Sequence, residues 1–272
     1  MADAIYRKQG DLYVPGEWAG GPWSQEHQHG GPVNALLTRA MAEAAADTGF
    51  QPVRITVDLL GPVPLAPLRS EWSFARRSRR MAVVVAALRH EGRDVARATG
   101  VLLRATPELE PSWTREDPAP EGPEGLEGVP LMHRAYREEA PPGFHWSLEI
   151  RIAPPPDPAA WITTPLDLVE GEPMTPLLRA AAVSDLAFGL AGRTLLKGGY
   201  TGVDAHRVML INTDTTLYFE RPPEGAWFGF RHELLADQEG VGLAEVAQFD
   251  ARGRYGRALQ VLLANSRAPS SQ

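Results

Sequence analysis

The chain has 272 residues, of which 43% are hydrophobic and 22% charged, and its formal net charge is −7 at pH 7. This composition is typical of a folded globular protein, and the excess of acidic residues argues against a general nucleic-acid binder, which needs surplus Lys and Arg to displace phosphate counterions. Because the chain contains no cysteine, disulfides, thiolate metal sites and a cysteine nucleophile are excluded.

The N-terminal sequence MADAIYRKQGDLYVPGEW lacks the charged region followed by an apolar stretch that marks a signal peptide. One of the longest apolar runs extends from Met81 to Leu88, which is far too short to cross a membrane. We therefore expect a cytoplasmic protein that binds neither membranes nor nucleic acids.

The first half of the chain predicts one helix followed by several strands. The helix begins after His29-Gly30-Gly31-Pro32, where the proline suits an early helical position, and it continues through 34–45. Runs rich in Val, Ile, Leu and Thr then predict strands at 53–60, 70–77, 81–90 and 94–105. Four arginines lie between the second and third of these strands; they indicate either a solvated turn or a site for a nucleotide phosphate: Arg76, Arg77, Arg79 and Arg80.

A segment dense in Pro, Glu and Gly separates the two halves, and neither helix nor strand periodicity continues through it. We predict a first unit at 1–106, a linker at 107–142 and a second unit at 143–272. The second unit repeats the order of signals, with a leading strand at 144–152, a helix at 175–191 and strands at 207–219, 226–235, 242–250 and 254–264.

The letters of the two halves also match, which indicates a duplication. Near the ends of the two sheets the matched residues are Arg97, Ala98, Val101, Leu102 and Leu103 in the first half and Arg257, Ala258, Val261, Leu262 and Leu263 in the second. Ile55 and Asp58 likewise match Ile211 and Asp214, which makes Thr56 the counterpart of Asn212. We therefore predict two copies of one unit, each with a helix against a mostly antiparallel sheet.

Asp185 is the strongest candidate for catalysis. It lies within the otherwise apolar segment AAAVSDLAFGLA, where an unpaired carboxylate is costly. Such a group is suited to act as a general base that takes a proton from water. The alternative is a carboxylate that bonds the nearby backbone at a helix bend.

Two further polar residues lie on predicted strands. Gln260 interrupts the apolar run ALQVLLA, and because the first half has Gly100 there, the strand itself does not need an amide. Period-two alternation puts Asn212 on one face with Asp214 and Thr216. For both residues the alternative is an outward-facing side chain on a half-exposed strand.

The residues before the first helix are candidates for binding substrate. Gly30 and Gly31 would let backbone N–H groups approach a ligand at a helix N-terminus, where a developing oxyanion is favoured, although they also suit a tight turn. His27 and His29 lie two residues apart, with no third ligand nearby. We predict no metal site and no cofactor.

The segments HGGPVNALL, SDLAF, YFERP and ALQVLLA, in this order, resemble the acyl-CoA thioesterase II family and its double hotdog relatives. The resemblance covers nearly the whole chain outside the linker. It implies an α+β fold of two tandem hotdog units, each with a long helix wrapped by an antiparallel sheet.

In that family an Asp, a Thr and a Gln of the second hotdog hold the attacking water. The resemblance carries these roles to Asp185, Asn212 and Gln260 as catalytic residues. Asn212 stands where the family has threonine, and Thr213 is the alternative if the register differs by one residue. We expect His29, Gly30, Gly31 and Thr213 to contact substrate.

The resemblance implies hydrolysis of an acyl-CoA to free acid and CoA. A non-catalytic acyl-CoA or acyl-chain binding protein is the alternative, because Asn212 departs from the family pattern. A hydratase of this fold would carry an Asp and His pair at the start of the catalytic helix, and the sequence does not show one there. We also expect a homodimer or higher homo-oligomer, since hotdog units leave sheet edges that further pairing covers.

Overall fold

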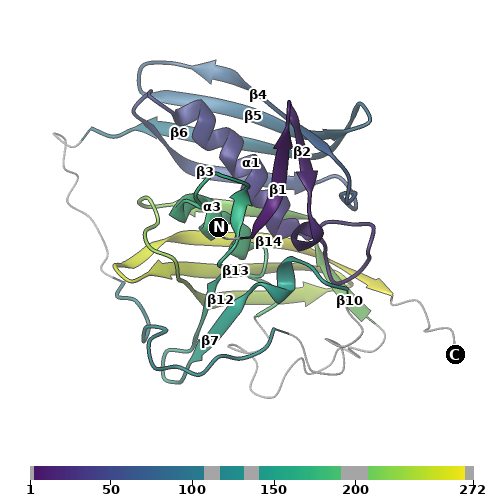
Figure 1. Ribbon diagram of the computed structural model, residues 1–272. Helices are drawn as coiled ribbons and strands as arrows, with labels where there is room; N and C mark the ends of the chain where they lie inside the picture. The colour runs from purple at the N-terminus through teal and green to yellow at the C-terminus, as the bar shows by residue number, and fades with distance from the viewer. Residues whose placement is uncertain (1–2, 107–116, 132–140, 191–207, 267–272) are drawn as a thin grey trace, which may run out of the picture.

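The computed structural model describes residues 3–106, 117–131, 141–190 and 208–266. A single curved sheet wraps around two helices, α1 (Gly30–Ala45) and α3 (Pro176–Ser184), which pack against each other inside it. Figure 1 shows α1 between the first-half strands above it and the second-half strands below it. The arrangement confirms the predicted α+β double hotdog.

The sheet takes strands from both halves of the chain. The first half contributes β1 (Ala4–Gln9), β2 (Leu12–Pro15), β3 (Phe50–Leu59), β4 (Leu68–Arg77), β5 (Met81–His90) and β6 (Arg93–Arg104), with a short helix η1 (Glu17–Ala19). The second half contributes η3 (Phe144–Trp146), β7 (Glu149–Ala153), β8 (Ala159–Thr163), β9 (Asp167–Val169), β10 (Val208–Asn212), β11 (Asp214–Phe219), β12 (Phe228–Gln238), β13 (Val241–Asp250) and β14 (Gly253–Ser266).

The strand order is β7-β8-β12-β13-β14-β11-β3-β6-β5-β4-β2-β1-β9, and β10 also pairs with β14. The halves join in the middle, where β11 runs antiparallel to β3 and Thr216 lies opposite Thr56. At the edge of the sheet β9, from the second half, pairs in parallel with β1. The second half therefore also supplies the last strand on the side of the sheet that the first half forms.

Both helices begin at caps that their sequences supply. His29 precedes α1 and its Nδ1 lies 3.1 Å from the Gly31 backbone nitrogen, while the Thr175 hydroxyl accepts a hydrogen bond from the Leu178 N–H at the start of α3. Pro176 follows the second cap, as expected for a first-turn proline. The apolar faces of both helices are buried against the sheet in one core.

The strands expected from the apolar runs are present, but several boundaries differ. The predicted strand at 207–219 is two strands, separated at Thr213. The predicted helix at 175–191 is regular only to Ser184, and residues 185–190 form turns. The segment at 144–152 begins with the short helix η3. Strands β1, β2, β8 and β9 were not predicted.

The register of the sheet corrects one detail of the duplication. Pro52 lies opposite Leu102 in the first half, as Asn212 lies opposite the matched Leu262 in the second. The ladder shifts between Pro52 and Arg54, and it also shifts at Thr213. By strand pairing, the counterpart of Asn212 is therefore Pro52 and not Thr56. The alignment of Ile55 with Ile211 by sequence does not take the shift in strand pairing into account.

The described part of the Pro-rich segment, 117–131, packs against the second half. The Trp161 indole N–H donates to the Glu121 carbonyl oxygen at 2.6 Å, and Asp117 forms an ion pair with Arg231 at 2.8 Å. These contacts anchor the segment at several points. We propose the division into units at 106 and 142 on the sequence pattern alone.

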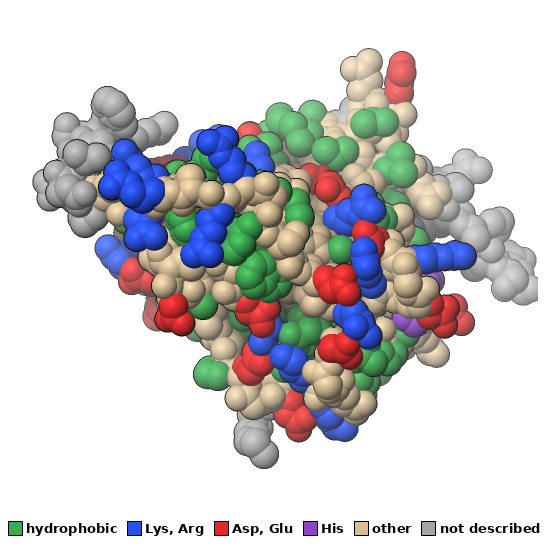
Figure 2. All heavy atoms as spheres, turned by 90° about the horizontal axis from the view of Figure 1, so that it is seen from above, with side chains coloured by type: hydrophobic (Ala, Val, Ile, Leu, Met, Phe, Trp, Pro, Cys, Tyr) green, Lys and Arg blue, Asp and Glu red, His purple; other side chains and the backbone are tan. Residues whose placement is uncertain are grey.

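The predicted arginine cluster lies at the exposed end of β4, which includes Arg76 and Arg77, and in the turn that leads to β5. The Arg104 backbone N–H donates to the Arg80 carbonyl oxygen, and Arg104 also stacks on Phe50, which follows α1 closely. The cluster is thus at the C-terminal end of α1. In the view of Figure 2, Lys and Arg side chains gather at one end of the molecule.

In the described part of the chain no helix has the length and apolar character of a membrane span.

Candidate functional site

Asp185 lies directly after α3, at the point where the regular helix ends, and its side chain is buried. Its Oδ1 atom accepts a hydrogen bond of 2.8 Å from Nδ2 of Asn212, which comes from the end of β10. This bond compensates part of the cost of burying the carboxylate. Two of the three predicted catalytic residues are therefore in direct contact.

The break at Thr213 explains how Asn212 reaches the site. Because one residue interrupts the ladder, the alternation of side chains changes phase between β10 and β11. Thr215 is buried at 1% exposure, whereas Asp214 and Thr216 are half-buried on the outer face. The prediction that Asn212 shares a face with Asp214 and Thr216 is therefore wrong.

His29 joins the site from the first half of the chain. Its Nδ1 atom lies 2.9 Å from Oδ2 of Asp185 and 3.1 Å from the Gly31 backbone nitrogen. A single ring nitrogen cannot donate to the carboxylate and accept from Gly31 at the same time. The short contact with Asp185 requires one proton between the two side chains, and when His29 carries it the Gly31 N–H is released.

Glycine is needed where α1 meets this carboxylate. A Cβ atom on Gly30 would lie 2.8 Å from Cγ of Asp185, and one on Gly31 would lie 2.6 Å from the backbone oxygen of Ala182. Both distances are shorter than any normal contact, so side chains there would separate the helices or move the carboxylate. Of the two glycines predicted to contact substrate, Gly30 thus lies directly against the Asp185 carboxylate and Gly31 lies against the backbone of α3.

Gln260 holds the turn that carries Asp185. Its Nε2 group donates to the Asp185 carbonyl oxygen at 3.0 Å and to the Thr215 hydroxyl at 3.1 Å, and its Oε1 accepts from the Phe188 N–H at 2.9 Å. The side chain is fully buried, as an inward-facing amide requires partners to be. These contacts make Gln260 a residue that positions Asp185.

Thr213, which was also predicted to contact substrate, faces the Val261 backbone. Its hydroxyl is 3.5 Å from the Val261 carbonyl oxygen, and among the described residues it is not one of those that contact the Asp185 carboxylate. Gln248, whose amide donates to the Ser184 hydroxyl at 2.7 Å, and His232 are polar residues of this region that were not predicted as site residues. Gln248 stands in no motif, and the run His232-Glu233-Leu234-Leu235-Ala236 lacks the second histidine of a zinc-protease motif.

His232 on β12 supports the turn after Asp185 from the other side. Its Nε2 lies 2.6 Å from the Ala187 carbonyl oxygen and donates to it in the neutral form. Burial disfavours the charged imidazolium and lowers the pKa of His232 to about 4. The backbone that carries Asp185 is therefore fixed by a neutral histidine and by Gln260.

Within the described ranges, no three His, Asp or Glu side chains come close enough together to hold a metal ion.

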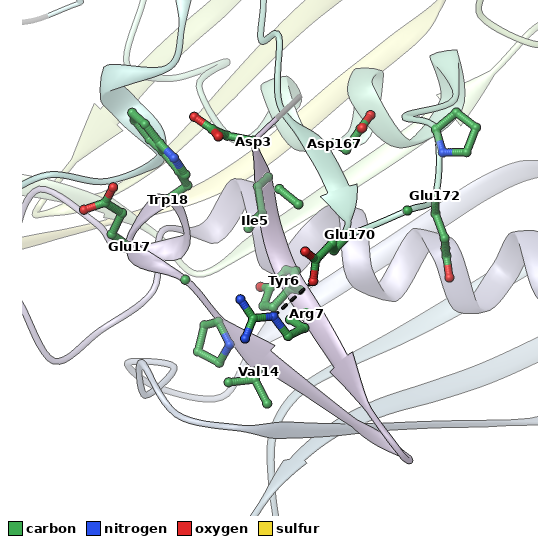
Figure 3. A pocket seen from close by; sticks show the side chains of 15 residues that line it. Asp3, Ile5, Tyr6, Arg7, Val14, Glu17, Trp18, Asp167, Glu170 and Glu172 are labelled. Atoms are coloured by element: carbon green, nitrogen blue, oxygen red, sulfur yellow. Dashed lines mark hydrogen bonds and ion pairs between the residues drawn. The ribbon is translucent and has the colours of Figure 1, made fainter. Parts of the chain in front are cut away.

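A cavity of about 690 Å³ occurs away from Asp185, beside η1, β1 and β9 (Figure 3). Its lining includes five carboxylates: Asp3, Glu17, Asp167, Glu170 and Glu172. Because this lining is acidic and contains none of the predicted site residues, it is a poor receptor for the phosphates of CoA.

Comparison with protein families matches the chain along almost its whole length. Residues 19–103 match an acyl-CoA thioesterase N-terminal domain, and residues 107–264 match an acyl-CoA thioesterase C-terminal domain. A comparison with curated proteins finds no match.

Solved structures share the fold. An acyl-CoA thioesterase II, TesB2, from Mycobacterium marinum is similar with a TM-score of 0.63 and 15% identity over 98% of this chain and 95% of that one. A protein with the hot dog fold from Alicyclobacillus acidocaldarius has a TM-score of 0.66 and 17% identity over 96% and 95% of the two chains. The matched domains show that the chain belongs to the acyl-CoA thioesterase family and is a thioester hydrolase.

Proposed function

We propose that the protein hydrolyses an acyl-CoA to a free acid and CoA by means of a water molecule that Asp185 activates. The observation that carries this proposal is the buried Asp185 carboxylate, held by Asn212 on one oxygen and by His29 on the other. Asp185, Asn212 and Gln260 would act as the catalytic set, with Gln260 acting through the turn. A thioester suits this chemistry because its carbonyl is activated and a thiolate leaves readily.

The reaction would proceed through a tetrahedral intermediate. Asp185 accepts a proton from water as the water oxygen bonds to the thioester carbonyl carbon. The carbonyl oxygen becomes an oxyanion, and the Gly31 N–H, at the start of α1, is the donor that becomes available when His29 holds the shared proton. Collapse of the intermediate breaks the carbon–sulfur bond, and Asp185 gives its proton to the leaving CoA thiolate, which restores the carboxylate.

Asn212 takes a different position from the one expected of a threonine that binds water. Its amide nitrogen bonds Asp185 directly, so we propose that it orients the base. The asparagine amide has a second N–H, which remains available for a water or a carbonyl oxygen. The departure from the family pattern is therefore compatible with turnover.

Release of free CoA from a panel of acyl-CoAs tests the proposal and separates it from a non-catalytic binding protein. Steady-state release from at least one acyl-CoA supports hydrolysis. Tight binding of acyl-CoAs without release would instead establish the binding protein. The panel also identifies the chain length and head group that fit.

The His29 and Asp185 contact favours a second candidate, which is elimination or addition of water on an acyl thioester. The sequence does not show this pair, because its members come from different halves of the chain. A base and an acid at this distance could remove a proton next to the carbonyl and protonate a leaving hydroxyl. Conversion of a hydroxyacyl-CoA to an enoyl-CoA, without free CoA, would establish this reaction.

We also propose a cytoplasmic homodimer or larger homo-oligomer. Apolar side chains on the outer face of the sheet support association: Val241, Val261 and Leu263 are 59%, 42% and 44% exposed. Val241 lies directly opposite Leu263 on neighbouring strands, so these side chains are adjacent. Light scattering at high micromolar concentration should give at least twice the mass of one chain, and a monomer would exclude the proposal.

A further inference from the structure

Asn34 on α1 has a buried side-chain amide without hydrogen-bond partners among the described residues. Its side chain is 1% exposed, and neither Nδ2 nor Oδ1 has a hydrogen-bond partner among the described residues. Thr38, one turn later, is 0% exposed, and its hydroxyl is likewise without a partner in the described part of the chain. Leaving such a buried group unpaired is costly, so each requires an explanation.

Helical geometry places both residues on the face of α1 that begins at the candidate active site. Successive residues of a helix are rotated by about 100°. Asn34 and Thr38 therefore point between the directions of Gly30, which faces Asp185, and Gly31, which faces Ala182. Asn34 lies four residues after Gly30, and therefore about 6 Å along the helix axis from the level of the Asp185 carboxylate.

The neighbouring buried amides differ from Asn34. Gln28 bonds the Tyr6 hydroxyl and the Pro64 carbonyl oxygen, and Gln260 uses both ends of its amide. The fold thus supplies partners for both ends of these two amides, whereas Gln248 donates to Ser184 and its Oε1 has no partner among the described residues. At Asn34 it leaves both a donor and an acceptor, close to the atoms that would react.

A hydroxyl group is the partner that matches this pair, because it can donate to Oδ1 or accept from Nδ2. A keto oxygen can only accept, and a saturated chain offers neither. We infer that Asn34, with Thr38 beyond it, determines specificity for an acyl group that carries a hydroxyl within the first few carbons from the thioester. This inference rests on the proposed hydrolysis at Asp185.

The test compares kcat/KM for CoA release by the full chain from 3-hydroxybutanoyl-CoA, 4-hydroxybutanoyl-CoA and butanoyl-CoA. We expect at least one hydroxylated substrate to exceed butanoyl-CoA by about 10-fold, the worth of one added hydrogen bond. Asn34→Leu, which keeps the volume and removes the amide, should bring that ratio close to one. Its melting temperature should be equal or higher, because an unsatisfied buried amide is lost.

Val33→Ala is the matched control, since Val33 is the buried apolar neighbour of Asn34. It should lower the melting temperature and keep the wild-type ratio. A wild-type ratio of one or less, or an unchanged ratio in Asn34→Leu, overturns the inference alone. If no acyl-CoA in the panel releases CoA, the proposed function fails as well, and the two failures are thus distinguished.

Discussion

The amide nitrogen of Asn212 donates a 2.8 Å hydrogen bond to Oδ1 of Asp185, so a residue from the strand break holds the carboxylate at the end of α3. This contact, between residues far apart in the chain, depends on the interruption at Thr213. Without that interruption the alternation of the strand would turn Asn212 toward the outer face, away from α3.

The first prediction is that Asp185→Asn reduces turnover by about 10²–10⁴, which is the usual contribution of a positioned general base. The substitution preserves the shape of the side chain and removes the proton acceptor. Initial rates of CoA release at saturating substrate measure the effect. Thr56→Ala serves as a control, because Thr56 faces outward and bonds Thr216. Retention of more than about a third of wild-type turnover in Asp185→Asn would contradict the mechanism.

The second prediction separates the roles of the two glycines at the start of α1. Gly30→Ala should reduce turnover by about 10², because the added methyl group displaces the Asp185 carboxylate while the backbone is left in place. Gly31→Ala should instead destabilise the protein by about 1–3 kcal/mol, since its methyl group meets the rigid backbone of Ala182.

Thermal unfolding and CoA release, measured on both variants, distinguish the two effects. Gly30→Ala is expected to unfold close to the wild-type temperature. If it instead loses stability while its activity per folded molecule stays normal, Gly30 does not act on the position of Asp185.

The third prediction concerns Gln260→Ala. Removal of the amide leaves the Phe188 N–H and the Asp185 carbonyl oxygen without their partner, and a buried unsatisfied group costs about 1–3 kcal/mol. We expect lower stability and a loss of turnover smaller than that of Asp185→Asn. Denaturant unfolding and kinetics should be compared with Leu259→Ala, which changes the adjacent half-buried residue of the same strand. Wild-type stability in Gln260→Ala would show that the turn is held by other contacts.

Sequence reasoning was most successful where local pattern and tertiary structure agree. The β5 strand is predicted residue for residue, because it is a continuous apolar run of strand length that polar turns bound. The fold class also followed, since both halves carry a capped apolar helix and long strands. The strands β1 and β9, at one end of the sheet, were missed because they are short and pair across the halves, and no local pattern encodes such a partner.

The candidate site was predictable only in part. Asp185 and Gln260 are polar residues in apolar runs, a contrast that is visible in the letters. The direction of the Asn212 side chain could not be predicted, because one extra residue at Thr213 shifts the register and no Gly or Pro marks the shift. The contact between His29 and Asp185 depends on how α1 and α3 pack, which periodicity does not specify.

The last prediction concerns stability at acidic pH and follows from His232. Burial lowers its pKa to about 4 in the folded protein, whereas an unfolded histidine titrates near 6.5. Between these values the unfolded chain binds a proton that the folded chain does not. The contribution of the neutral histidine is therefore fully present above about pH 6.5 and is lost as the pH falls toward 4, with a slope of about 1.4 kcal/mol per pH unit.

His232→Gln removes this titration and retains an N–H that can donate to the Ala187 carbonyl oxygen. Urea unfolding of both proteins at several values between pH 7 and pH 4 should show a steeper loss for the wild type, by about that slope. Parallel profiles would mean that His232 does not titrate as its burial implies. Protonation keeps the Nε2–H that donates to the Ala187 carbonyl oxygen, so the loss of stability comes from burying the charge and not from losing this bond. The activity of the wild type should then fall with its folded fraction in this range, while His232→Gln should retain activity to lower pH.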